Sequence, residues 1–136
     1  MKKFFAFVLV LFFSAAISAQ KKELYQLSSH ILDITTGKPA PDVVIRLEQL
    51  SENNTWSLVS RKTTDANGRV GDFLPYGEIR HQGTYKLVFE TAPYFKRQQR
   101  DSFYPWIEVV FAISDNQHYH VPITVSPFGY ATYKGN

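Results

Sequence analysis

Residues 32–50 read LDITTGKPAPDVVIRLEQL, and this stretch decides the fold class. Its second part places apolar residues at every second position, Val43, Ile45 and Leu47, which alternate with Val44, Arg46 and Glu48. Because successive side chains of a strand point to opposite faces of a sheet, this alternation predicts a half-buried β-strand. The preceding TTGKPAPD is rich in turn-forming residues, so the stretch predicts a strand, a polar turn and a second strand.

The same period of two recurs along the rest of the chain. Residues 84–90, 107–113 and 118–125 alternate in this way, and the turn signals DANG, PYGE, SDNQ and SPFG punctuate the chain. Residues 94–100 predict one short helix, because they lack turn residues and β-branched residues. Several short strands with regular turns predict an all-β protein built as a β-sandwich of two sheets.

The first 19 residues, MKKFFAFVLVLFFSAAISA, have the pattern of a secretory signal peptide. Two lysines precede an apolar run, residues 4–13, that is short for a membrane span, and small residues follow it up to Ala19. We therefore expect residues 1–19 to be cleaved and residues 20–136 to form one exported domain without a membrane anchor. Its location would be periplasmic in a Gram-negative host. The sequence contains no cysteine, so disulfides cannot stabilise this domain.

Charge and motif searches exclude several classes of function. The formal net charge is only +3, and the basic cluster KRQQR at residues 96–100 is interpreted as a solvated face. We therefore expect no nucleic-acid partner. The sequence has no G-x-S-x-G motif of serine hydrolases, and Gly68 and Gly71 are isolated glycines rather than a phosphate-binding loop.

Two of the four histidines, His118 and His120, stand two residues apart near the end of the chain. The apolar residues of this predicted strand take one face, so both histidines face away from the core of the domain. Such a pair could bind zinc, lie exposed on the surface, contact another subunit, or act as acid and base. Zinc would need further ligands, and the remaining histidines, His30 and His81, carry no carboxylate motif around them. We therefore expect no metal and favour an acid–base role.

A further candidate is Arg69, which ends the segment TTDANGR at residues 63–69. Asn-Gly supplies a tight turn because both residues tolerate positive φ angles, so the turn should hold Arg69 at the start of a strand. Taken alone, such a turn is common in extracellular β-sandwich modules.

Four segments together resemble the 5-hydroxyisourate hydrolases, the transthyretin-related enzymes of purine catabolism. In chain order they are LSSHILDITTGKPAPDV, TTDANGR, YFKRQQRDSFYPWIEVVF and HYHVPITVSPFGYATYKGN. The resemblance implies a transthyretin-like (prealbumin-like) sandwich with one short helix, assembled as a homotetramer, a dimer of dimers with sites between subunits. It implies catalysis without a cofactor by His30, Arg69 and His120. Hormone-carrying transthyretins share the fold but lack this combination of residues.

The resemblance also assigns the last four residues to substrate binding: Tyr133, Lys134, Gly135 and Asn136. The family usually ends Tyr-Arg-Gly-Ser, so Lys134 replaces an arginine and Asn136 replaces a serine. Lysine keeps the charge but loses the planar fork of donors, and asparagine keeps the polarity but not the hydroxyl.

The implied reaction is hydrolysis of 5-hydroxyisourate to 2-oxo-4-hydroxy-4-carboxy-5-ureidoimidazoline in urate degradation. Two alternatives stay open at this point. One is an exported, non-catalytic prealbumin-like module that binds a small ligand, and the other is a metal-binding protein that uses His118 and His120.

Overall fold

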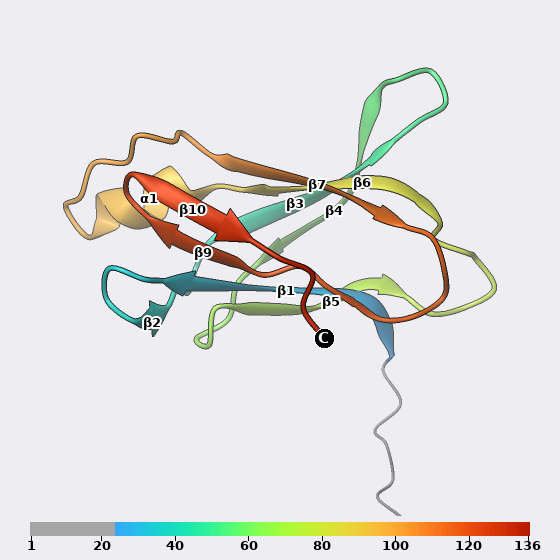
Figure 1. Ribbon diagram of the computed structural model, residues 1–136, viewed down its shortest axis with the longest axis horizontal. Helices are drawn as coiled ribbons and strands as arrows, with labels where there is room; N and C mark the ends of the chain where they lie inside the picture. Colours follow the sequence, from blue (N-terminus) through green and yellow to red (C-terminus); the bar gives the residue numbers. More distant parts are fainter. Residues whose placement is uncertain (1–23) are drawn as a thin grey trace, which may run out of the picture.

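The computed structural model describes residues 24–136, and it confirms the predicted all-β sandwich. Figure 1 views the two sheets edge-on, with β3, β6 and β7 in one layer and β1 and β5 in the other. One short helix, α1, lies at one end of the layers. The expected signal peptide, residues 1–19, lies outside the described residues.

The first sheet has six strands and is centred on β1 (Tyr25–Asp33). On one side, β1 pairs antiparallel with β5 (Arg69–Pro75) and, near its end, with β2 (Lys38–Pro39). It also pairs in parallel with β8 (Tyr119–His120) and β9 (Ile123–Ser126), and β9 continues to β10 (Gly129–Thr132). The N-terminal strand β1 therefore pairs directly with β8 and β9 from the C-terminal part of the chain.

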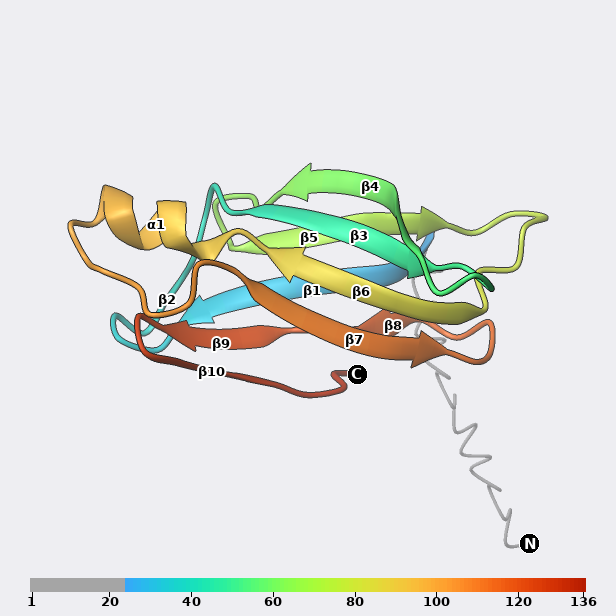
Figure 2. The same ribbon diagram turned by 90° about the horizontal axis from the view of Figure 1, so that it is seen from above.

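The second sheet has four antiparallel strands in the order β4-β3-β6-β7. Their bounds are Trp56–Thr63 for β4, Val44–Leu50 for β3, Gly83–Phe89 for β6 and Ile107–Ile113 for β7. Figure 2 shows the same layers from above, with this sheet lying across β1. This arrangement confirms strands at 43–48, 84–90 and 107–113, each with its alternate apolar residues turned inward.

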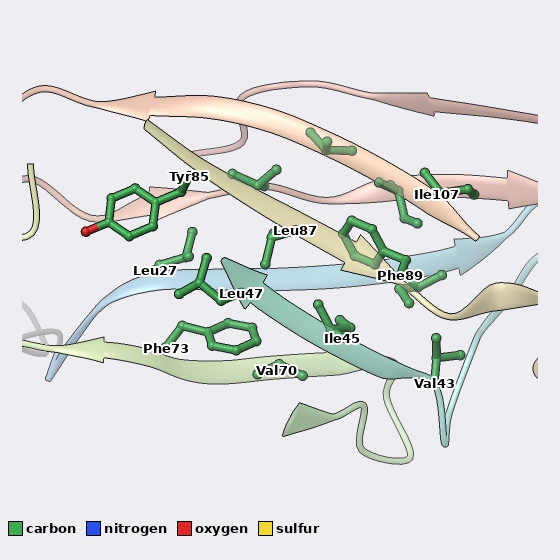
Figure 3. Close-up of a cluster of buried hydrophobic side chains, with 14 of the residues drawn as sticks. Leu27, Val43, Ile45, Leu47, Val70, Phe73, Tyr85, Leu87, Phe89 and Ile107 are labelled. Atoms are coloured by element: carbon green, nitrogen blue, oxygen red, sulfur yellow. The ribbon is translucent and has the colours of Figure 1, made fainter. Parts of the chain in front are cut away.

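The hydrophobic core fills the space between the sheets. Figure 3 shows that the labelled side chains of both sheets point into this space. Fully buried large side chains of the core include Leu27, Ile31, Ile45, Leu47, Phe73, Leu87 and Phe89. On β1 the buried residues alternate with partly exposed ones, so Ser28 and His30 face outward. The outer face of the six-stranded sheet is thus free to carry polar chemistry.

The helix α1 spans Thr91–Arg97, three residues earlier than the sequence predicts. The prediction required an absence of turn and β-branched residues, so it began after Pro93, but a proline is tolerated in the first helical turn, where the backbone N–H groups lack intrahelical partners. The helix ends where Gln99 adopts a φ of 56°, and the Arg100 N–H closes the end on the Phe95 carbonyl. Among the described residues, no helix is long and apolar enough to cross a membrane.

The predicted continuous strand at 118–125 is interrupted. It forms two short strands, β8 and β9, because Pro122 lies between them and has no N–H to donate to a sheet ladder. The predicted facing nevertheless holds, because Tyr119, Val121 and Ile123 are buried while His118 and His120 are only partly so.

Candidate functional site

A polar hollow of about 450 Å³ lies on the outer face of the six-stranded sheet. This volume falls within the usual range of small-molecule sites, roughly 300–1,000 Å³. Its lining comes from β1, β5, the segment around β8 and the C-terminal tail, namely Ser28, Arg69, Gly71, His118, His120 and Asn136. The predicted residues Arg69, His120 and Asn136 are therefore brought together from three distant parts of the sequence.

The pairing of β1 with β5 places two predicted residues side by side. His30 and Arg69 are direct cross-strand partners, so their side chains share the outer face of the sheet. The turn before Arg69 fixes its backbone, because Asp65 Oδ1 accepts hydrogen bonds from the N–H groups of Asn67 at 2.8 Å and Arg69 at 2.9 Å. Gly68 completes this turn with a φ of +69°, the left-handed conformation that glycine adopts without strain.

A β-bulge lies beside this pair. Between the partners Leu27↔Phe73 and Ser29↔Val70, β5 contains one residue more than β1. The two residues of β5 at the bulge are Gly71 and Asp72, and Gly71 lines the hollow. Bulges bend a strand locally and re-aim its side chains, and they are frequent next to functional sites. Alternation alone did not reveal this feature.

His120 is held beside β1 by a chain of hydrogen bonds. Its Cα pairs with that of Ser28 in the parallel ladder, and Ser28 Oγ lies 2.8 Å from His120 Nδ1. The same hydroxyl lies 2.9 Å from His118 Nε2, and His118 Nδ1 lies 2.8 Å from the carbonyl oxygen of Tyr25. The sequence analysis left His118 out of the catalytic set and did not single out Ser28. The available signal was its spacing, two residues before His30 on the same face.

The C-terminal tail closes over His120. After β10 the chain turns back and ends on the outer side of the six-stranded sheet (Figure 1). The Gly135 N–H donates to the His120 carbonyl oxygen at 2.8 Å. A Cβ atom at position 135 would lie only 2.5 Å from His120 Cδ2, so a glycine is required for this close approach. The tail therefore packs directly against the imidazole.

The other two tail residues lie elsewhere. The ammonium of Lys134 lies 5.2 Å from the centre of the Tyr119 ring, a cation–π contact. Together with Tyr133, which is 61% exposed, Lys134 lines a separate groove of about 250 Å³ beside β7. Within one chain, the structure thus brings Asn136 to the hollow and Gly135 against His120, but it does not bring Tyr133 and Lys134 to the hollow. Their assignment to substrate binding stays a prediction.

Burial and positive charge act together on His30 and His120, which we call the site histidines. Burial lowers the pKa of His30 below its usual 6.5 and Arg69 lowers it further, against smaller opposing effects of Asn67 and Asp65. Burial also lowers the pKa of His120, followed by the charges of Arg69, His30 and His118. Both site histidines are therefore neutral near pH 7 and can accept a proton.

The arrangement favours acid–base chemistry over metal binding. Within residues 24–136, no three or more His, Cys, Asp or Glu side chains gather in a metal-binding arrangement. In the His118–His120 pair, three of the four ring nitrogens already have hydrogen-bond partners. The structure places His81 away from the hollow, with its Nε2 near the Pro75 carbonyl oxygen. Neutral imidazoles beside a guanidinium can deprotonate water and stabilise negative charge on an oxygen.

Comparison with known proteins gives a consistent result. The model of the HIUase/Transthyretin family matches residues 27–135. A probable 5-hydroxyisourate hydrolase of Caenorhabditis elegans is 47% identical over 81% of both chains. The 5-hydroxyisourate hydrolase of Salmonella typhimurium is 44% identical over 81% of this chain and 80% of its own.

Solved structures agree with these sequence relatives. The Klebsiella pneumoniae 5-hydroxyisourate hydrolase superimposes with a TM-score of 0.69 at 35% identity, covering 81% of this chain and 98% of its own. Sea bream transthyretin in complex with thyroxine gives a TM-score of 0.75 at 28% identity, covering 81% and 94%. The chain therefore belongs to the HIUase/Transthyretin family.

Proposed function

We propose that this protein hydrolyses 5-hydroxyisourate to 2-oxo-4-hydroxy-4-carboxy-5-ureidoimidazoline. The observation that carries the proposal is that Arg69 and His120 line one hollow on the outer face of the sheet, with His30 on the same face as the cross-strand partner of Arg69. The relatives named as 5-hydroxyisourate hydrolases support it, because they match most of the chain at 44–47% identity. The protein is thus an enzyme that opens a cyclic amide with water.

The reaction needs one proton transfer in each direction. A neutral site histidine takes a proton from water as the oxygen bonds to the ring carbonyl carbon. The carbonyl oxygen becomes negative, and the guanidinium of Arg69 stabilises this charge, an effect typically worth about 3 kcal/mol for a single donor. The C–N bond then breaks, and the imidazolium returns its proton to the leaving nitrogen. No cofactor is needed for these steps.

A carrier function fits the hollow less well. The sea bream relative is solved with thyroxine, whereas this hollow contains an arginine and two histidines and no large apolar side chain among its lining residues. A polar, anion-prone ring such as 5-hydroxyisourate is better matched to this positive site. The metal-binding alternative is weakened because Ser28 and Tyr25 engage three of the four ring nitrogens of His118 and His120.

We further propose that the enzyme is a homotetramer, a dimer of dimers. The hollow lies on a sheet face that the described chain covers only with its tail, so a second subunit would complete a closed pocket. Substrate contacts by Tyr133 and Lys134 would also be possible across such an interface. Light scattering coupled to size exclusion measures the assembly, and a monomer with full activity would contradict this proposal.

Export is a separate proposal that rests on the sequence of residues 1–19. Expression of the full chain in a Gram-negative host, followed by cell fractionation and mass determination, tests it. Cleavage near Ala19 with periplasmic recovery is expected. An uncleaved chain in the cytoplasm would contradict export without affecting the proposed reaction.

The activity is tested by generating 5-hydroxyisourate with urate oxidase and following its ultraviolet decay. We expect the wild type to accelerate the decay equally with and without a chelator. His120→Asn should abolish the acceleration and leave a folded protein, while His81→Asn, remote from the hollow, serves as the matched control. Loss of activity with the chelator would favour a metal-binding protein. No acceleration by the wild type would favour the non-catalytic module that binds a small ligand.

A further inference from the structure

His118 and Ser28 form a directional hydrogen-bond chain behind His120. The direction follows from its first member, because the carbonyl oxygen of Tyr25 can only accept. The Nδ1 atom of His118, 2.8 Å away, must therefore be the donor. In a neutral imidazole the other nitrogen is then an acceptor, so His118 Nε2 carries a lone pair.

The next two links follow in the same way. The Ser28 hydroxyl has one hydrogen, and it donates this hydrogen to His118 Nε2 at 2.9 Å. Its oxygen can then only accept from His120 Nδ1 at 2.8 Å, so Nδ1 carries the hydrogen of the His120 ring. The remaining nitrogen of His120, Nε2, is left unprotonated. The surrounding contacts thus define the tautomer of His120.

We propose that Ser28 and His118 are positioning residues that hold His120 with Nδ1 protonated and with Nε2 as the proton-accepting atom for the hydrolytic water. This inference rests on the proposed hydrolase function, which it deepens by assigning the base. The second nitrogen of a histidine sets the tautomer through its own hydrogen bond, and this is the role that the chain gives to Ser28. In the reaction, water gives its proton to Nε2, and the resulting imidazolium keeps Nδ1–H on Ser28 until Nε2 returns the proton to the leaving nitrogen.

The chain offers a closely matched control for the test. Ser29 is the neighbour of Ser28 on β1 but faces the core, and its hydroxyl donates to the Val121 carbonyl oxygen at 2.8 Å. Ser28 and Ser29 thus both join β1 to the segment around β8, and only Ser28 touches His120. Ser29→Ala therefore measures the effect of weakening this junction alone.

The test measures kcat and KM for the wild type and four variants. Ser28→Ala and His118→Phe should lower kcat about 10- to 100-fold, part of the 10²–10⁴ that a positioned base contributes, while KM changes less than about threefold. Ser28→Thr keeps the hydroxyl and should stay within about threefold of the wild-type kcat. Ser29→Ala should keep the wild-type kcat.

A spectroscopic readout reports the tautomer independently of turnover. The ¹⁵N shifts of the His120 ring distinguish a protonated from an unprotonated nitrogen, and we expect protonated Nδ1 and unprotonated Nε2 in the wild type and in Ser28→Thr. Ser28→Ala should lose this fixed assignment. The proposal is overturned if wild-type His120 carries its hydrogen on Nε2, or if Ser28→Ala matches Ser29→Ala in kcat. If the wild type fails to accelerate the decay, the hydrolase function itself is wrong, and the ¹⁵N shifts still decide the tautomer.

Discussion

Replacing Gly135 by alanine tests whether the tail is part of the site. The added Cβ would lie 2.5 Å from His120 Cδ2 and 3.2 Å from His120 Cβ and Cγ. Carbon atoms in contact prefer separations of about 3.5–4.0 Å, so a relative shift of roughly 1 Å is needed. Either the imidazole or the tail must move.

The cheaper movement can be estimated. Rotating the His120 ring off its rotamer costs about 1 kcal/mol, and breaking its hydrogen bond to Ser28 costs about 1 kcal/mol more. Moving the tail breaks the hydrogen bond between the Gly135 N–H and the His120 carbonyl oxygen, which costs about 1 kcal/mol. The tail should therefore move, and Asn136 leaves the hollow while His120 stays in place.

The expected result follows from losing the substrate contact that we propose for Asn136. One hydrogen bond of about 1 kcal/mol corresponds to about a fivefold loss in kcat/KM, and it should appear mainly as a higher KM. Displacement of the imidazole by 1 Å would instead lower kcat by about 100-fold. Steady-state measurement of the ultraviolet decay at several substrate concentrations separates the two results.

The control for this substitution is Gly129→Ala, also near the end of the chain. A Cβ atom at position 129 would lie 3.7 Å from Ser126 Oγ, an ordinary contact, so wild-type kinetics are expected. Both variants should melt close to the wild-type temperature, because neither glycine belongs to the core. If Gly135→Ala also shows wild-type kcat and KM, the tail does not contribute to the site and the reasoning is refuted.

Two further substitutions test the turn and the charge of the site. Gly68→Ala should cost about 1–3 kcal/mol for the left-handed φ, and more because its Cβ would lie 2.7 Å from the Ile31 carbonyl oxygen. Gly37→Ala has the same φ of +69° with nothing within 4 Å, so in thermal unfolding it should lose less stability, and an equal loss would contradict the steric argument. Arg69→Gln should raise the pKa values of the site histidines toward 6.5, measured by NMR titration, because Arg69 lowers both. In the wild type, these lowered pKa values mean that the unfolded chain binds more protons than the folded chain as the pH falls below 6.5. The free energy of unfolding therefore decreases over this range. Arg69→Gln should weaken this decrease.

The sequence predicts the layers of this fold well, for a physical reason. A period of two reports which face of a strand is buried, and the burial of Ile45, Leu47 and Leu87 follows it directly. The period does not report backbone hydrogen bonds. It therefore missed the interruption at Pro122 and the bulge at Gly71. At both places the flanking side chains keep their inner and outer faces, while the backbone hydrogen bonds between strands change.

The site was predicted in part for the same reason. Alternation and the resemblance single out His30, Arg69 and His120 by residue type, and the structure places them on one face. Ser28 was missed because its spacing from His30 indicates only that the two residues share a face, and not which side chains Ser28 contacts. The side-chain direction of Lys134 could not be predicted either, since the tail residues after β10 follow no strand period.

The bulge in β5 has a consequence for how this sheet can evolve. Val70 and Phe73 both face the core although three positions separate them, which is possible because the strand contains one additional residue between them. Loss of that residue would leave a regular strand with the same inner and outer faces. Elsewhere in a strand, inserting or deleting one residue turns the core-facing side chains toward solvent. At this point beside the hollow, such a change of length is permitted. The length of the strand can therefore change next to the proposed catalytic groups while the core sequence stays the same.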